Sequence, residues 1–193
     1  MKKVIAITGG IGSGKSLAAK FLKENGYKVV SCDEITDSLY KKHRVKKLLS
    51  KIFPSAAKGK LFIKIDKKAV AKEVFSDSEK RNRLNALMHP LIVDYAIRKA
   101  RRGNGKISFV EIPLLFETQS QEKFDGIIII KRPIENRIAA VVKRSKITEE
   151  EVVQRIGTQF EYETADLSAY TVIENDGDKE NLKKAVLTAI EKF

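Results

Sequence analysis

Residues 9–16 read Gly-Gly-Ile-Gly-Ser-Gly-Lys-Ser, which follows the pattern G-x-x-x-x-G-K-S. The apolar run 4–7 before this segment is typical of a buried strand, and residues 17–22 after it repeat apolar side chains at helical spacing. Glycines let the backbone turn tightly between a strand and a helix and point several N–H groups at phosphate oxygens. The helix that follows adds the positive end of its dipole. The segment therefore predicts a phosphate-binding loop (P-loop) and a nucleoside triphosphate as ligand.

The residues of the P-loop have different expected roles. Lys15 is placed to reach the β- and γ-phosphates, and the hydroxyl of Ser16 is placed to bind Mg²⁺. The alternative is a chance glycine-rich turn, but the strand before the loop and the helix after it argue against that interpretation. The other loop residues expected to contact the triphosphate are Gly10, Ile11, Gly12, Ser13 and Gly14.

Short apolar segments alternate with helical segments along the chain. Strands are expected at about 3–8, 27–30, 106–112, 124–130 and 170–173, with helices between them. The third and fourth are apolar on both faces, as buried parallel strands are. We therefore expect an α/β fold, a P-loop NTPase-like parallel five-stranded sheet wrapped by helices, whose ligands bind at the carboxyl ends of the strands.

The chain is expected to form one P-loop domain, 1–193, with three functional parts. The nucleotide-binding core comprises 1–33, 103–135 and 168–193. The helical insertion 34–102 is a natural place for a second substrate. The segment 136–167 carries basic residues, Lys143, Arg144 and Lys146, near a helix–helix connection, and a capping box at Thr148 opens its second helix, which runs to about 160. We therefore interpret it as a mobile lid over the phosphate site. We refer to it as the lid segment.

Two local signals predict helix boundaries inside the insertion. Residues 76–79 read Ser-Asp-Ser-Glu, a capping box that predicts a helix start at Ser76. His89 precedes Pro90, and the residue before a proline avoids the helical region, so we expect the helix to be interrupted there.

Composition limits the class of protein. The 193 residues carry a net charge of +13 and one cysteine, Cys32, so an internal disulfide is excluded. No apolar run approaches the roughly 20 residues of a membrane helix, and we expect a cytoplasmic protein without a membrane partner. The positive charge raises the possibility of nucleic acid as a partner. Because the basic residues are scattered along the chain, we favour solvated surfaces and polyphosphate ligands instead.

Transfer of a γ-phosphoryl group needs a P-loop, Mg²⁺, a carboxylate near the acceptor hydroxyl and arginines for the developing charge. Asp33, after the second strand, is the expected carboxylate, and a helix N-cap is its alternative role. Glu111, at the end of the third strand, is expected to help hold Mg²⁺ through water. The candidate arginines in the lid segment are Arg137, Arg144 and Arg155, each of which also has an ordinary surface role as an alternative.

Other P-loop classes lack support in the sequence. The N-K-x-D and D-x-x-G motifs of GTPases do not occur, and neither does the L-S-G-G-Q signature of transporter ATPases. Small-molecule kinases remain, with nucleotide kinases as the nearest physical type.

The motifs together resemble those of the dephospho-CoA kinase family over nearly the whole chain. The P-loop matches, Asp33 falls on the last acid of the family's D-A-D motif, and His89-Pro90 is similar to its H-P segment. Residues 113–117, Pro-Leu-Leu-Phe-Glu, match its most discriminating motif. Further matches are Arg144 in the lid, Arg155-Ile156 with Gln159, and Asn175 with Gly177.

The resemblance implies ATP-dependent phosphorylation of the ribose 3′-hydroxyl of dephospho-coenzyme A, the last step of coenzyme A synthesis. It implies that Asp33 acts as base, that Asn175 lies near the adenine of ATP, and that His89 and Leu115 bind the acceptor substrate. It implies that Lys15 and Arg144 neutralise charge on the transferring group, with Mg²⁺ as cofactor. We expect a monomer or a weak homo-oligomer.

The sequence departs from the family pattern at several positions. Ser31 and Cys32 replace the first two residues of D-A-D, Ala140 replaces a lid arginine, and Arg137 falls near the family's glutamine. Tyr170 replaces an aspartate late in the chain. Two alternatives stay open at this point, namely another small-molecule kinase for nucleosides or nucleotides, and a nucleic-acid-binding ATPase.

Overall fold

A computed structural model describes residues 2–59 and 62–193. Met1, Lys60 and Leu61, which fall in the expected ranges 1–33 and 34–102, lie outside the described residues. The chain divides into two compact units, one comprising Met1–Ser31 with Ile97–Phe193 and the other Cys32–Ala96.

The first unit contains the predicted five-stranded sheet, and all of its strand pairs are parallel. The strand order is β2-β5-β1-β6-β7, which places β1 at the centre with the P-loop at its carboxyl end. This confirms the expected fold class. The strands are β1 Lys3–Thr8, β2 Lys28–Ser31, β5 Ile107–Glu111, β6 Gly126–Lys131 and β7 Thr171–Glu174.

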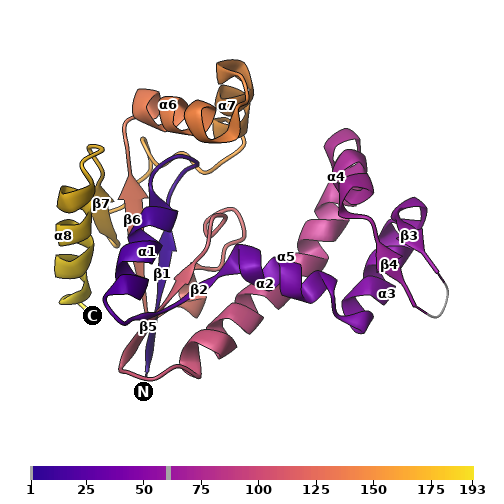
Figure 1. Cartoon of the computed structure of the whole chain (residues 1–193), viewed down its shortest axis with the longest axis horizontal. Coiled ribbons are helices and arrows are strands. Elements are labelled where there is room, and N and C mark those ends of the chain that lie inside the picture. Colours follow the sequence, from indigo (N-terminus) through magenta and orange to yellow (C-terminus); the bar gives the residue numbers. More distant parts are fainter. Residues whose placement is uncertain (1, 60–61) are drawn as a thin grey trace. The chain divides into compact units, whose positions relative to one another are not determined.

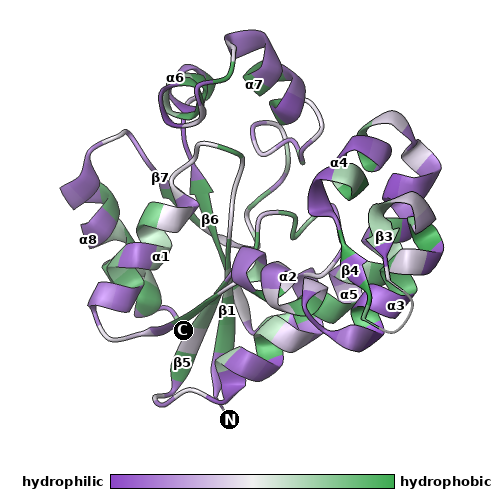
Figure 2. Cartoon of the chain, turned by 45° about the vertical axis from the view of Figure 1, so that its right-hand side comes forward, coloured by the Kyte–Doolittle hydropathy of each residue, from purple (hydrophilic) through white to green (hydrophobic). Residues whose placement is uncertain are grey.

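Both faces of the sheet are buried, as the apolar strands require. Successive side chains of a strand point to opposite faces, and in β1 both Ile5 and its neighbour Ala6 are fully buried. Figure 2 shows the central strands as largely hydrophobic. On one face, α1 Lys15–Glu24 and α8 Lys179–Ile190 pack side by side (Figure 1). Phe21 and Leu22 of α1 and Leu182 of α8 share this core with Ile5 and Phe109 of the strands.

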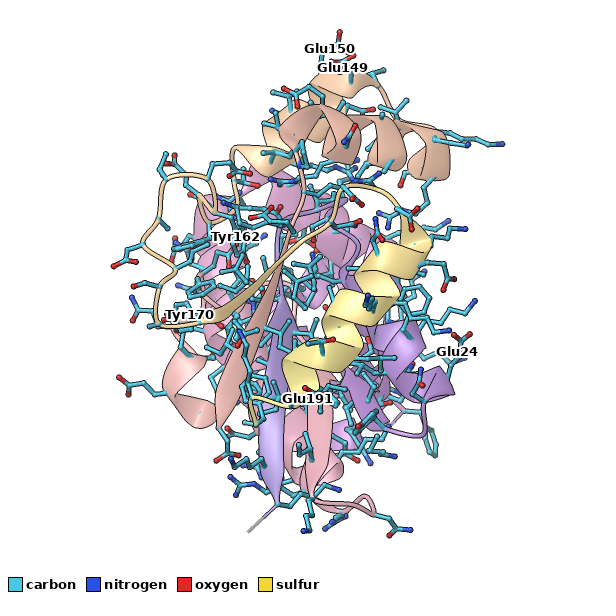
Figure 3. All side chains as sticks on the ribbon, turned by 90° about the vertical axis from the view of Figure 1, so that its left-hand side faces the viewer. Glu24, Glu149, Glu150, Tyr162, Tyr170 and Glu191 are labelled. Carbon is cyan, nitrogen blue, oxygen red and sulfur yellow. The ribbon has the colours of Figure 1, made fainter. Side chains whose placement is uncertain are left out.

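Two further helices follow β6 in the first unit. They are α6 Ile134–Ser145 and α7 Glu149–Ile156, and Figure 2 shows α6 with both hydrophobic and hydrophilic residues and α7 as mainly hydrophilic. The capping box predicted at Thr148 is present, since the Thr148 hydroxyl accepts from the Glu151 N–H and the Glu151 carboxylate accepts from the Thr148 N–H. Glu149 and Glu150 lie at the outer end of α7 (Figure 3). The helix α7 ends at Ile156, four residues before the expected position 160. Gln159, in the chain that follows, contacts the P-loop.

The second unit is mainly helical. Buried side chains at helical spacing, Val45 and Leu49, continue into Phe53 and form one apolar stripe of its core. A two-stranded antiparallel sheet, β3 Ala57–Lys58 with β4 Lys64–Ile65, was not expected. The helices are α2 Cys32–Tyr40, α3 His43–Ile52, α4 Lys67–Ser76 and α5 Ser78–Arg101, with one turn of 3-10 helix at Pro54–Ala56; α5 continues into the first unit.

Two boundary predictions in this unit were wrong. Ser76 ends α4, and its hydroxyl donates to the Lys72 and Glu73 carbonyls of the preceding turn. Asp77 starts α5 instead, because its carboxylate accepts from the Lys80 N–H at 3.0 Å.

The predicted interruption at Pro90 is also absent, since α5 runs through it. A proline inside a helix costs about 3 kcal/mol. Met88, Val93 and Ala96 are buried on either side of Pro90 in the sequence. Each large apolar side chain contributes about 1.5–3 kcal/mol on burial, enough to offset the cost of the proline.

Among the described residues, no helix is both long enough and apolar enough to cross a membrane.

Candidate active site

The P-loop joins β1 to α1 in a conformation that depends on its glycines. Gly12 and Gly14 have positive φ angles, +78° and +104°, which side chains with a Cβ rarely adopt. Gly14 is the N-cap of α1, so the first N–H groups of that helix open toward the loop. One internal bond, from the Ser13 N–H to the Gly10 carbonyl at 3.2 Å, closes the loop.

The side chain of Lys15 folds back onto the first residues of the P-loop. Its Nζ donates to the carbonyl of Gly9 and, at 2.8 Å, to that of Gly10. Burial lowers the pKa of Lys15 to about 8; Glu111 and Glu117 oppose this shift and Arg137 and Arg144 add to it. The loop therefore holds Lys15 in a poorly solvated position, where the phosphates of a nucleotide would stabilise its charged form and raise its pKa again.

Ser16 and Glu111 meet at the carboxyl end of the sheet. The Ser16 hydroxyl donates to Oε1 of Glu111 at 2.6 Å. Glu111 ends β5, and its strand partners are Ile7 of β1 and Ser31 of β2. A hydroxyl and a carboxylate are oxygen donors of the kind that Mg²⁺ prefers beside substrate phosphates. The chemistry of this pair therefore fits the Mg²⁺ ion that the sequence predicts.

Asn175 lies against the P-loop from the end of β7. Its side chain is buried, its Nδ2 donates to the Ser13 carbonyl at 2.7 Å and its Oδ1 accepts from the Gly177 N–H. A Cβ on Gly14 would lie 2.5 Å from that Nδ2. Asn175 is thus brought together with the loop by a contact that spans 162 residues of sequence.

The three arginines of the lid segment have different surroundings. Arg137 is buried, with 3% of it exposed, and its Nε donates to the Ile11 carbonyl at 3.0 Å. Its Nη1 forms an ion pair with Glu163 at 2.7 Å. Arg144 and Arg155 are exposed. Of these two, Arg144 is the one whose charge acts on the pKa of Lys15.

The residues that follow α7 contact the loop and the sheet, although most of them belong to no recognisable motif. Gln159 Oε1 accepts from the Ile11 N–H at 2.7 Å. The hydroxyls of Tyr162 and Thr8 are 3.2 Å apart, and burial raises the pKa of Tyr162 to about 12. Only Gln159, in the R-I-x-x-Q match, carried a signal that pointed here.

The segment 113–117 is joined to the same region by aromatic contacts. Phe116 stacks on Phe160 with ring centroids 4.4 Å apart and meets Tyr162 and Tyr170 edge-on. Glu117 accepts from the Phe160 N–H at 2.9 Å. Residues of the Pro-Leu-Leu-Phe-Glu motif therefore bind the chain that follows α7 through ring stacking and a hydrogen bond.

The predicted acceptor-site residues are spread over both units. Leu115 belongs to the first unit and is fully buried, whereas its neighbour Leu114 is exposed. In the second unit, Asp33 is exposed in the first turn of α2. The helix begins at Cys32, so Asp33 is not the N-cap. His89 is half-buried within α5 of the second unit.

Comparisons with known proteins agree with these motifs. The family described as dephospho-CoA kinase matches residues 3–181. A dephospho-CoA kinase of Thermus thermophilus is 34% identical over 183 residues, covering 95% of this chain and 88% of the relative. One from Fusobacterium nucleatum is 31% identical over 183 residues, covering 95% and 94%.

Solved structures give the same result. A crystal structure of a Thermus thermophilus protein has a TM-score of 0.84 and 33% identity, covering 100% of this chain and 98% of that one. A dephospho-CoA kinase from Campylobacter jejuni has a TM-score of 0.72 and 26% identity, covering 100% and 97%. The chain belongs to the dephospho-CoA kinase family.

Proposed function

We propose that the chain transfers the γ-phosphoryl group of ATP to the ribose 3′-hydroxyl of dephospho-coenzyme A, giving coenzyme A and ADP. The observation that carries the proposal is Lys15, buried in the P-loop with its Nζ against the Gly9 and Gly10 carbonyls. Polyphosphate oxygens that reach this ammonium group would stabilise its charged form. Family membership supports the choice of acceptor.

The nucleotide would bind through the P-loop and the start of α1. Backbone N–H groups of residues 10–16 would surround the phosphates, with Lys15 at the β- and γ-phosphates. Asn175, which bonds to the Ser13 carbonyl, would shape the loop and border the adenine. Arg144 is the exposed lid arginine whose charge already acts on Lys15, and it would neutralise the transferring group.

Ser16 and Glu111 would hold Mg²⁺, with Ser16 as a direct ligand and Glu111 acting directly or through water. When bound, the ion would neutralise charge on the β- and γ-phosphates.

The acceptor side of the reaction depends on Asp33. Ser31 ends β2 beside Glu111, and Asp33 follows two residues later, at the carboxyl end of a parallel strand where ligands of such sheets bind. Asp33 would orient the 3′-hydroxyl and accept its proton. The hydroxyl oxygen forms a bond to the γ-phosphorus while the bond to the bridging oxygen of ADP breaks. His89 and Leu115 remain proposed acceptor contacts.

The direct test is incubation of the protein with ATP, Mg²⁺ and dephospho-coenzyme A, followed by mass analysis of the product. We expect coenzyme A, with the new phosphate on the 3′-oxygen. Nucleosides and nucleoside monophosphates belong in the same assay as competing acceptors. Preferential phosphorylation of one of them would replace the proposal by another small-molecule kinase activity.

The cellular location and the oligomeric state stay predictions. A cytoplasmic location and a monomeric or weakly oligomeric state follow from the sequence analysis, and light scattering at working concentration would test the second. Binding to nucleic acid is not expected, and the absence of salt-sensitive binding to RNA at about 0.15 M salt would agree with that.

A further inference from the structure

The tip of the P-loop is held by side chains from the lid segment. Ile11 has one backbone donor and one backbone acceptor, and both are bonded to that segment. Its N–H donates to Gln159 Oε1 at 2.7 Å, and its carbonyl accepts from Arg137 Nε at 3.0 Å. These partners are 148 and 126 residues away in sequence, so neither bond follows from local structure.

Several contacts hold the side chain of Arg137 against the P-loop. Its Nη1 is paired with Glu163, and its burial leaves 3% of it exposed. A Cβ on Gly10 would lie 2.2 Å from its Nη2, and a Cβ on Gly12 would lie 2.6 Å from its carbonyl oxygen. Gly10 has no positive φ angle, so in this structure the Arg137 guanidinium is what opposes a side chain at this position.

A glycine-rich loop loses much conformational entropy when it is ordered around a ligand. Contacts that hold the loop in one conformation before the ligand arrives reduce that loss at binding. Asn175 holds the Ser13 end of the loop, and Arg137 with Gln159 holds Ile11. Glu163 fixes the guanidinium and balances its charge.

We propose that Arg137, Gln159 and Glu163 form a clamp on Ile11 that preorganises the P-loop, so that Arg137 is a positioning residue for nucleotide binding. In this role Arg137 does not contact the transferring phosphoryl group, and that function is left to Arg144. The proposal rests on the proposed function only in taking an adenine nucleotide as the P-loop ligand.

The two possible roles of Arg137 predict different affinities for ADP, which lacks the γ-phosphate. A residue that shapes the loop affects ADP and ATP together, because both place a β-phosphate in it. A residue that contacts only the γ-phosphoryl group leaves ADP binding unchanged and lowers kcat. Binding of Mg²⁺-ADP and Mg²⁺-ATP, measured by calorimetry, therefore separates the two.

We expect Arg137→Met to weaken ADP and ATP binding in parallel, each by about tenfold, since it removes a hydrogen bond to a charged group that orders the loop. Arg137→Lys should not rescue the loss, because one ammonium group does not reproduce the fork of a guanidinium. Gln159→Met and Glu163→Gln, which are milder changes, should weaken ADP binding in the same direction. The matched controls are Lys20→Met and Glu24→Gln, an exposed i,i+4 ion pair on α1.

The proposal is overturned if Arg137→Met and Glu163→Gln bind ADP as tightly as the Lys20→Met and Glu24→Gln controls do. It is also overturned if Arg137→Met lowers kcat but leaves ADP affinity unchanged, because Arg137 would then act on the phosphoryl group. If Arg137→Met does not fold by circular dichroism, Gln159→Met and Glu163→Gln decide alone. Failure of the wild type to phosphorylate dephospho-coenzyme A would reject the proposed function without touching this test, which needs only nucleotide binding.

Discussion

Lys15 lies in the P-loop, as expected, but its pKa is lower than that of an ordinary lysine. Burial lowers the pKa of Lys15 from its ordinary value of 10.5 to about 8, and bound phosphates would raise it again. Nucleotide binding should therefore take up a proton above pH 8, and ATP affinity should fall by up to about tenfold per pH unit as the pH rises from 8 toward 10.

Calorimetry of ADP binding at pH 8.5, in two buffers of different ionisation enthalpy, measures this uptake. Lys15→Met, titrated at ADP concentrations high enough to compensate for its weaker binding, should show no difference between the two buffers. Since the unfolded chain binds the Lys15 proton up to about pH 10.5, this residue also makes the ligand-free protein more stable as the pH rises from 8 to 10.5. Equal heats in both buffers for the wild type would contradict the assignment.

Asp33 is expected to act on the acceptor and not on the nucleotide. Asp33→Asn keeps the shape of the side chain but removes the base, so we expect turnover to fall by about 10²–10⁴-fold with ATP affinity nearly unchanged. Asp37→Asn is the control, since Asp37 lies one turn later in α2, paired with Lys67. Turnover of Asp33→Asn at the wild-type rate would remove this residue from the mechanism.

Glu111 is expected to control the requirement for Mg²⁺. Because it accepts the Ser16 hydroxyl at 2.6 Å, Glu111→Gln should raise the Mg²⁺ concentration needed for half-maximal activity by about 10–100-fold. A titration of activity with Mg²⁺ at saturating ATP checks this, with Glu191→Gln, at the end of α8, as control. An unchanged titration midpoint would show that Glu111 has only a structural role.

The chain after α7 is an element without regular structure that is nevertheless fastened to the sheet. Tyr162 and Tyr170 both contact Phe116, and Figure 3 shows them on the segment that leads into β7. Only the Tyr162 hydroxyl reaches a side-chain partner among the described residues, Thr8 at the end of β1. The two tyrosines therefore form a matched pair for testing this hydrogen bond.

Tyr162→Phe should lower the free energy of unfolding by about 1 kcal/mol, since it leaves the buried Thr8 hydroxyl with one partner fewer. Tyr170→Phe keeps the ring contacts and should lie within about 0.5 kcal/mol of the wild type. Urea unfolding measures both. Equal effects of the two substitutions would show that ring packing, and not the hydroxyl, holds this segment.

At the level of the whole molecule, binding of a nucleotide should stabilise the folded state by mass action. Mg²⁺-ADP at about 100 times its Kd adds about 2.7 kcal/mol, which corresponds to a rise in Tm of about 5–10 °C for a chain of this size. Differential scanning calorimetry measures the shift. Lys15→Met should lose most of it, and a full shift in that variant would show that the nucleotide binds elsewhere.

The P-loop, the five parallel strands, the capping box at Thr148 and the N-cap at Asp178 were predictable because each depends on residues close together in sequence. Glycines at fixed offsets, apolar runs and an N-cap side chain act over one or two turns of chain. Asp178 accepts from the N–H groups of Glu180 and Asn181, as a local signal requires. The pairing of Ser16 with Glu111 was also within reach, since both residues follow parallel strands and such ends meet at one edge of a sheet.

What only the tertiary structure decided are the interactions between segments far apart in the sequence. The same basic pattern that made Arg137, Arg144 and Arg155 equal candidates left one of them buried against Ile11 and two exposed. Burial of neighbouring side chains likewise lets α5 continue through Pro90. Local sequence specifies which conformations a segment prefers, but burial and partner choice depend on which distant segments arrive beside it. For that reason the chemistry of the P-loop could be read from eight residues, whereas the side chains that hold it in place could not.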